Sequence, residues 1–278
     1  MKLYKINQGI IIENNSKLFF LPEEPWDAFV NDDDLYQKML SITESHTPDE
    51  DVERFLSSDL RAPIHNQEIW ASGVTYFRSK VGRQEESKDT GGAEFYARVY
   101  EAERPEIFFK SSAYRSVGHG EKVRIRPDSS WDVPEPELTL MITSSGKIVG
   151  YTIGNDMSSR SIEGENPLYL PQAKSYDKSA AIGPCIYVTE KPLARETSIN
   201  LEIFRGQNKV FEGTVAIDQI KRSFEELVTY LYKATSFPYG SLLMTGTGIV
   251  PGHDFTLQSK DEIHITIEPI GKLVNEVE

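Results

Sequence analysis

Two acidic segments that a predicted β-hairpin brings together constrain this chain more than any other feature. The first is Glu135-Pro136-Glu137, and the second is Asp156 at the end of a largely apolar run. A turn centred on Ser145-Gly146 would pair Ser144 with Lys147. It would also place apolar residues opposite one another on one side of the ribbon: Leu138 and Ile153, Leu140 and Tyr151, and Ile142 and Val149.

The same register places Glu135 directly opposite Asp156, with Glu137 on the same face. Like charges about 5 Å apart across a ladder are destabilising, so a positive group is needed to compensate them. Three converging carboxylates make an all-oxygen site, which suits Mg²⁺, Mn²⁺ or Ca²⁺ and not zinc. The competing interpretation is an exposed strand start whose acids meet only water, and a register slip of one residue would also separate them.

Composition narrows the class of protein. A net charge of −13 over 278 residues, with no basic stripe, argues against nucleic acid as a partner. The single cysteine, Cys185, excludes an internal disulfide and is compatible with a reducing compartment. The sequence has neither a signal-peptide pattern nor an apolar run of membrane-spanning length, so we expect a cytoplasmic protein without a membrane partner.

The beginning of the chain differs in character from the rest. Residues 1–22 alternate apolar runs with turns and predict a small antiparallel unit. Residues 26–42 are expected to be helical, and Thr47-Pro48-Asp49-Glu50 has the pattern of a capping box opening a helix to about Leu56. We therefore predict a small N-terminal α+β domain over residues 1–64.

Residues 65–278 are predicted to form a mainly β catalytic domain, so the whole chain is mixed α+β. Strand-like runs dominate and crossover helices are rare, which favours an antiparallel or mixed β-roll. One helix is expected from Ser223 to about Lys233, again behind a capping box. The charged segment 78–103 could be either a helical insertion or a lid over a site.

Several residues in this region could carry chemistry. Lys174, in an irregular segment, would favour its neutral form near a metal and so could act as a general base, although a surface lysine is the simpler interpretation. Glu106 borders an apolar run and could stay protonated, or could merely end a strand. Ser111 and Arg115 suit an anionic ligand, and the small residues around Thr247 suit a carboxylate, although structured loops explain both segments as well.

Four ordered motifs resemble the fumarylacetoacetate hydrolase superfamily over about residues 68–275: Pro134–Leu138, Gly150–Arg160, Ala181–Pro184 and Thr245–Thr247. The resemblance implies a β-roll domain that is usually dimeric or tetrameric. It also implies Mg²⁺ (or Mn²⁺) held by Glu135, Glu137 and Asp156, and a small 2-keto or 1,3-diketo acid substrate.

Further segments, including Arg104–Lys110 and Glu163–Gln172, resemble the branch of that superfamily that dehydrates 2-keto-3-deoxy-D-arabinonate. This likeness implies that Lys174 and Glu106 are the acid and base, in either order, with Ser111, Arg115, Tyr76 and Thr247 contacting the substrate. The expected reaction is dehydration of a 2-keto-3-deoxypentonate to 2,5-dioxopentanoate in pentose catabolism.

One departure from the superfamily separates this reaction from hydrolysis. Hydrolases of the superfamily activate water with a His and a Glu three residues apart on a lid. In this sequence Ser79 and Gly82 stand at those positions. Neither can take a proton from water at neutral pH, which disfavours hydrolysis. If the lid aligns differently, another histidine could serve, so an acylpyruvate-type hydrolase or decarboxylase remains the alternative. A binding protein without activity is the third.

Overall fold

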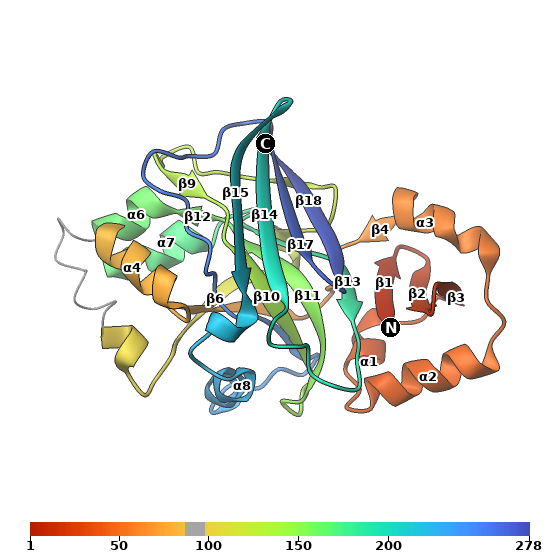
Figure 1. Cartoon of the computed structure of the whole chain (residues 1–278). Coiled ribbons are helices and arrows are strands. Elements are labelled where there is room, and N and C mark those ends of the chain that lie inside the picture. Colours follow the sequence, from red (N-terminus) through yellow and green to blue (C-terminus); the bar gives the residue numbers. More distant parts are fainter. Residues whose placement is uncertain (87–97) are drawn as a thin grey trace.

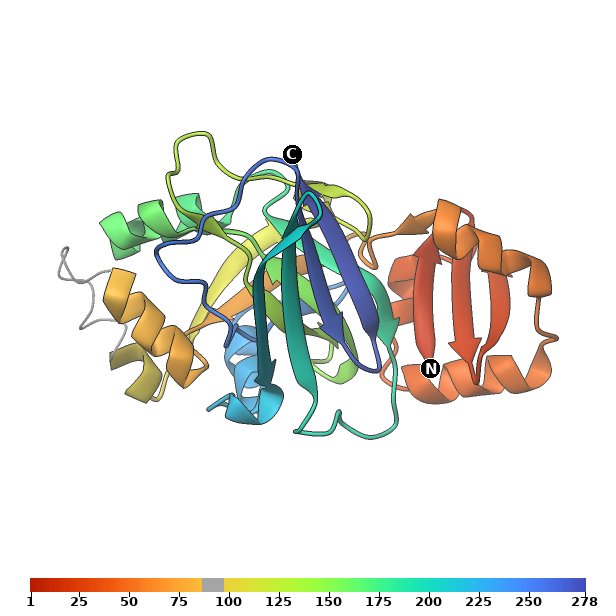
Figure 2. The ribbon, with the colours of Figure 1, turned by 45° about the horizontal axis from the view of Figure 1, so that its top comes forward.

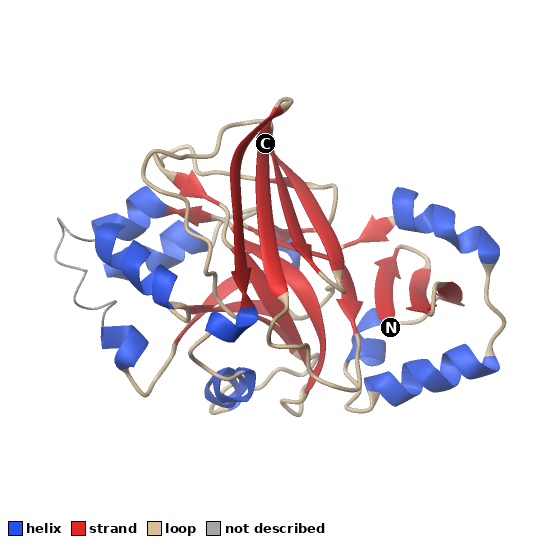
Figure 3. Ribbon diagram, in the orientation of Figure 1, coloured by secondary structure: helices blue, strands red, loops and turns tan. Residues whose placement is uncertain are grey.

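A computed structural model of the chain describes residues 1–86 and 98–278, and its architecture is a pair of packed β-sheets with helices at the periphery (Figures 1 and 3). Within the described residues the large sheet follows this order: β3 (Lys17–Pro22), β2 (Gly9–Asn14), β1 (Lys2–Ile6), β13 (Ala180–Tyr187), β11 (Ile148–Asp156), β10 (Pro136–Ile142), β16 (Ser241–Met244), β5 (Glu68–Gly73) and β6 (Glu106–Ser112). Two short strands join it from the side, β4 (Leu60–Arg61) on β1 and β7 (Ser116–Val117) on β13.

The second sheet covers one face of the first. Its order is β15 (Asn208–Ala216), β14 (Ser198–Arg205), β17 (Asp261–Ile267), β18 (Gly271–Val277) and β8 (Lys122–Val123). Leu138 and Leu140 of β10 pack in one apolar cluster with Leu201 of β14 and Ile265 of β17. Among the described residues most strand pairs are antiparallel and three are parallel, and strands outnumber helices, which confirms the mainly β, mixed α+β class.

The first sixty residues form the lobe at the right of Figure 2, in which three antiparallel strands pack against helices. The expected antiparallel unit over residues 1–22 is confirmed. The expected helix over residues 26–42 is two helices, α1 (Trp26–Val30) and α2 (Leu35–Ser45), and Phe29 and Met39 from them are buried against the large sheet. Because β1 pairs with β13, the lobe continues the large sheet, while the division of the chain at residue 64 stays a prediction.

The third predicted helix has a different start from the one expected. It begins as the 3-10 helix η1 (Glu50–Val52) and continues as α3 (Glu53–Ser58). The Asp49 side chain accepts a hydrogen bond from the Asp51 amide, so Asp49 is the N-cap and Thr47 is not. An aspartate placed next to the helix start can serve this role as well as threonine can.

The remaining helices lie beside the ends of the strands. Those with complete bounds in the described part of the chain are α4 (Phe77–Glu86), α6 (Arg160–Glu165), α7 (Leu170–Lys174) and α8 (Phe224–Tyr232), with 3-10 turns η2 (Ala113–Arg115), η3 (Pro167–Tyr169) and η4 (Ile217–Gln219), and residues 98–101 are also helical. Helix α8 begins behind the Ser223 side chain, as the capping box predicted. The proposed lid segment 78–103 is helical at its start, and its residues 87–97 lie outside the described residues. The short strands β9 (Asp132–Val133) and β12 (Ser158–Ser159) pair with one another next to α6.

The β10–β11 hairpin has the predicted register but not the predicted turn. The ladder pairs Leu138 with Ile153 and Leu140 with Tyr151, as expected. The Thr143 amide donates to the Lys147 carbonyl and the Gly146 amide donates to the Thr143 carbonyl, so three residues form the loop instead of two. Gly146 has φ +86°, as the left-handed last position of such a loop requires.

A β-bulge corrects the shift that the longer loop introduces. Ile142 pairs with Ile148 and not with Val149 as predicted, while Met141 pairs with Gly150, so Val149 is the residue left over. Beyond this bulge the ladder returns to the predicted register, and Pro136 lies opposite Asn155. The loop and the bulge together therefore keep Glu135 opposite Asp156.

Candidate active site

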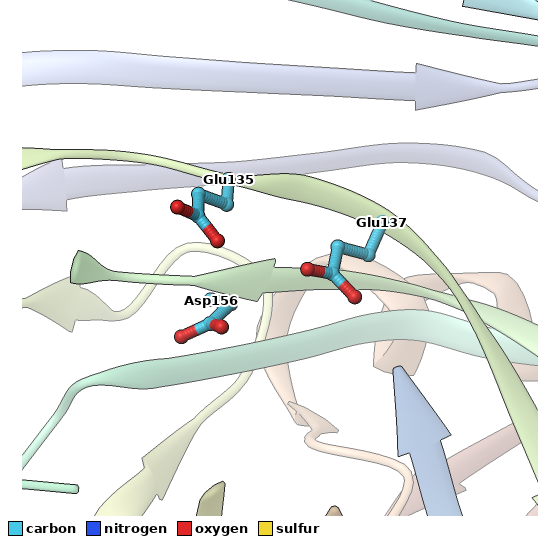
Figure 4. Close-up of side chains that lie close together, drawn as sticks. All are labelled: Glu135, Glu137 and Asp156. Carbon is cyan, nitrogen blue, oxygen red and sulfur yellow. The ribbon is translucent and has the colours of Figure 1, made fainter. Parts of the chain in front are cut away.

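The three predicted acids meet at one end of the β10–β11 hairpin (Figure 4). Glu135 immediately precedes β10, Glu137 lies in it, and Asp156 ends β11; the Asp156 amide donates to the Glu135 carbonyl at 2.9 Å. One carboxylate oxygen from each residue lies within 4.8 Å of the others, and all three side chains are buried. An all-oxygen set of this kind fits a hard divalent cation such as Mg²⁺.

Burial and neighbouring charges shift the pKa values of two of the acids in opposite directions. Burial, followed by the charges of Asp156 and Glu135, raises the pKa of Glu137 well above its ordinary value. Burial alone would also raise the pKa of Asp156, but the ammonium groups of Lys110 and Lys174 hold it below its ordinary value. The Gly246 amide donates to Glu137 Oε2 at 2.5 Å, which orients that carboxyl group.

Three cationic side chains contact the carboxylates. Lys174 Nζ lies 2.7 Å from Glu135 Oε2 and 3.0 Å from Asp156 Oδ2, and it also donates to Ser158 Oγ at 2.5 Å. On the other side of Asp156, Lys110 Nζ lies 2.5 Å from Oδ1. Arg160 Nη2 donates to Glu135 Oε1 at 2.6 Å. Lys174, a predicted site residue, therefore contacts two of the three predicted acids.

A small cavity opens onto this cluster. Its lining combines the three acids, the basic side chains of Arg160 and Lys174, and small or apolar residues from three other segments: Ser72, Gly73, Val74, Ser79, Phe108, Gly246 and Thr247. Glu106 lies beside its wall, since a Cβ built on Gly73 would be 2.1 Å from Glu106 Oε2. Glu106 is therefore close to the cavity, on the strand next to Gly73 in the ladder.

Of the four residues predicted to contact the substrate, one lines the cavity and three do not belong to its described lining. Thr247 lines the cavity, and Tyr76 is buried, where burial and the nearby charge of Glu137 raise its pKa. Ser111 donates to the Ser112 carbonyl, and Arg115 pairs with Asp177 at 3.6 Å with its side chain partly in solvent. Neither Ser111 nor Arg115 belongs to the described lining of the cavity, and their role as substrate ligands stays a prediction.

Sequence reasoning gave no role to Lys110 or Arg160, and it included Gly246 only in a loop of small residues whose backbone amides suit a carboxylate. Arg160 is the first residue of α6, a helix of six residues that the sequence pattern does not announce. Lys110 directly follows the apolar run Ile107-Phe108-Phe109, and a basic residue at the end of a strand-like run was a usable signal, although only the pairing of β6 with β5 brings it to the site.

Ser79 and Gly82, the positions where the resemblance to hydrolases leads one to expect a His and a Glu, lie on α4. Ser79 lines the cavity, and its hydroxyl donates to the Tyr76 carbonyl at 2.7 Å and accepts from the Tyr76 amide at 3.2 Å. Gly82 follows one turn later. The residue lining the cavity from this helix therefore offers a hydroxyl already engaged with the backbone.

Comparison with known proteins gives a consistent family assignment. Residues 69–278 match the family described as fumarylacetoacetate (FAA) hydrolase C-terminal. The chain is 45% identical to a probable 2-keto-3-deoxyxylonate dehydratase of Haloferax volcanii, with 83% of this chain and 80% of that protein covered. It is 40% identical to the 2-dehydro-3-deoxy-D-arabinonate dehydratase of Saccharolobus solfataricus, with 100% of this chain and 96% of that protein covered.

Solved structures agree with these sequence matches. The structure of 2-keto-3-deoxy-D-arabinonate dehydratase complexed with magnesium and 2,5-dioxopentanoate superimposes with a TM-score of 0.83 at 36% identity, covering 100% of this chain and 99% of that one. No helix in residues 1–86 or 98–278 is long and apolar enough to cross a membrane.

Proposed function

Because the chain belongs to the fumarylacetoacetate hydrolase family, we propose that it is a Mg²⁺-dependent dehydratase of a 2-keto-3-deoxy sugar acid. The substrate we assign is a 2-keto-3-deoxypentonate and the product is 2,5-dioxopentanoate. The observation that carries this proposal is the buried triad of Glu135, Glu137 and Asp156, contacted by Lys174 at the wall of a cavity.

The carboxylates fit the metal that the family implies. They are three converging oxygen ligands, buried, and compensated in this structure by the Lys174 ammonium, which lies between Glu135 and Asp156. When bound there, Mg²⁺ supplies a Lewis acid for the oxygens of a 2-keto acid and a charge that disfavours a neighbouring ammonium.

We assign to Lys174 the removal of the proton at C3. Its side chain is fully buried and enters the cavity from the end of α7, with Nζ 5.9 Å from the centre of the Phe108 ring. Its position at the cavity wall brings this nitrogen next to the space where the triad would hold a cation. Ser158, which accepts a hydrogen bond from Nζ, orients the amine.

We assign to Glu106 the transfer of a proton to the departing C4 hydroxyl. The C3 proton leaves, the C4–O bond breaks, and water departs with the proton from Glu106, which gives 5-hydroxy-2-oxopent-3-enoate. Moving one proton from C5 to C3 gives the enol of 2,5-dioxopentanoate, and protonation at C4 with loss of the proton from the C5 hydroxyl completes the aldehyde. Lys174 and Glu106 between them supply the base and acid that these transfers require.

The substrate names of the two dehydratase relatives describe closely related chemistry. A 2-keto-3-deoxypentonate has a ketone at C2 and a methylene at C3, so C4 is its only stereocentre. An arabinonate and a xylonate of the same C4 configuration therefore give the same compound, which is the substrate class we assign.

Hydrolysis of an acylpyruvate is the second candidate on the same scaffold. Ser79 is the residue that weighs against it, because a serine held by the Tyr76 backbone cannot activate water as a histidine does. Thr247, Tyr76, Ser111 and Arg115 remain our proposed substrate contacts; the position of Thr247 in the cavity wall supports its inclusion.

We also place this enzyme in the cytoplasm, in pentose catabolism, as a homodimer or homotetramer. Its one cysteine, Cys185, is a free buried thiol, which suits a reducing compartment. Six large apolar side chains of the described residues reach solvent in the single chain, and the three most exposed, Phe77, Tyr114 and Leu168, support an interface between copies. Light scattering of the purified protein measures the assembly.

Assays with Mg²⁺ on 2-keto-3-deoxypentonates and on acylpyruvates test the activity. We expect a semialdehyde product from the pentonate, loss of activity with a chelator, and no activity from Glu137→Gln, which removes one anionic ligand. Pyruvate release from an acylpyruvate would instead support the hydrolase, and metal binding without turnover of either substrate would support a binding protein.

A further inference from the structure

Lys110 is a fully buried lysine to which the reaction above gives no role. It lies in β6, where the pairing with β5 shifts between Ile69 and Trp70: Ile69 faces Ser111, whereas Trp70 faces Phe109. Lys110 is therefore the extra residue of a β-bulge. Bulges next to active sites re-aim a side chain that regular pairing would direct elsewhere.

The Lys110 ammonium has three acceptors for its three protons. It contacts Asp156 Oδ1 at 2.5 Å, donates to the Met157 carbonyl at 2.9 Å, and donates to the Lys174 carbonyl. One acceptor is thus a proposed metal ligand, and another is the backbone of the proposed base. Lys110 joins the end of β11 to the end of α7, two segments that carry the chemistry.

The two buried lysines take opposite oxygens of Asp156. Lys110 holds Oδ1, while Lys174 Nζ lies 3.0 Å from Oδ2 and also 2.7 Å from Glu135 Oε2. Lys174 therefore occupies the space between two ligands, where a bound cation would compete with it. Lys110 lies outside that space and can keep its contacts when a cation enters.

We infer that Lys110 is a positioning residue, which holds Asp156 Oδ1 and the Lys174 carbonyl so that Oδ2 and the Lys174 amine face the reacting centre. The inference rests on the proposed function, because it takes Asp156 as a metal ligand and Lys174 as the base. A positioning role and a simple charge-balancing role predict opposite effects of removing Lys110 on metal binding. A cation that only balanced charge would repel a metal, so its removal would strengthen metal binding.

Mn²⁺ binding in the absence of substrate tests whether removal of Lys110 weakens or strengthens metal binding. The binding is measured from the paramagnetic resonance signal of free Mn²⁺. We expect Lys110→Met to raise the Mn²⁺ dissociation constant about 10–100-fold, the usual effect of removing a group that orients a metal ligand. Lys174→Met, which removes a competing ammonium, should leave the constant unchanged or lower it. As a matched control, Lys209→Met removes a lysine paired with Glu202 and Glu212 at the surface, and it should have no effect.

Folding and the proposed function are tested separately. If Lys110→Met does not fold by circular dichroism, Lys110→Arg keeps the charge but cannot reproduce three bonds from one nitrogen, and it should still weaken Mn²⁺ binding. Unchanged or tighter binding by folded Lys110 variants would overturn the inference, as would an equal loss in Lys174→Met. Failure of the unaltered protein to bind Mn²⁺ would instead overturn the proposed metal site.

Discussion

Replacing Gly73 with alanine tests whether Glu106 takes part in the reaction. A Cβ at this position would lie 2.1 Å from Glu106 Oε2 and 2.6 Å from Cδ, whereas ordinary contact begins at 3.4 Å. The carboxyl group must therefore move by about 1.3 Å. A misplacement of about 1 Å in a catalytic group can cost about 10²-fold in rate. That loss corresponds to about 2.7 kcal/mol of activation free energy.

The assay is steady-state formation of the aldehyde product from a 2-keto-3-deoxypentonate, with circular dichroism to establish folding. We expect Gly73→Ala to lower kcat about 10²-fold, and Gly73→Ala/Glu106→Gln to be no slower than Glu106→Gln alone. Gly252→Ala is the control, because its Cβ would meet only an Asp254 oxygen among the described neighbours, at 2.8 Å. A wild-type kcat in folded Gly73→Ala would refute the assignment of Glu106 as the acid.

Two further predictions concern buried titratable groups outside the triad. Burial raises the pKa of Asp132 to about 6 from 3.8, so the folded state binds this proton more tightly than the unfolded state. The resulting stability is present below pH 3.8 and is lost as the pH rises to about 6. Asp132→Asn should therefore gain up to about 3 kcal/mol over the unaltered protein on going from acid to neutral pH, measured by urea unfolding. Burial also raises the pKa of the Cys185 thiol to about 12, so a thiol reagent at about pH 8 should react only after denaturation, and prompt reaction of the native protein would contradict the buried placement.

The hairpin shows both what the sequence could predict and where prediction failed. Alternating apolar residues determined which residues of β10 and β11 face one another, because burial on the faces of a sheet specifies register strongly. The turn was wrong by one residue, since Ser144-Ser145-Gly146 suits a three-residue loop as well as a two-residue one. The bulge at Val149 restored the register, and nothing in the local pattern announces it.

The cationic half of the site was harder to predict for a different reason. Arg160 and Lys174 lie on helices of six and five residues, which tertiary contacts stabilise more than local propensity does. Lys110 enters the site through a bulge in the pairing of β6 with β5, and bulges depend on both strands. The convergence of acidic residues on one hairpin can be predicted from local sequence. The convergence of cations from distant segments can be predicted only when the whole fold is known.

The charges around the triad also couple the binding of the metal to the binding of the substrate. The cationic groups of Lys110, Lys174 and Arg160 contact Glu135 and Asp156, and with Glu137 counted beside them the formal charges of these six side chains cancel. Entry of a dication leaves a surplus of positive charge in a buried space, and an anionic 2-keto acid reduces it. Metal and substrate should therefore strengthen one another's binding by the same factor, because such coupling is reciprocal. The substrate is then also a counter-ion for its own activator.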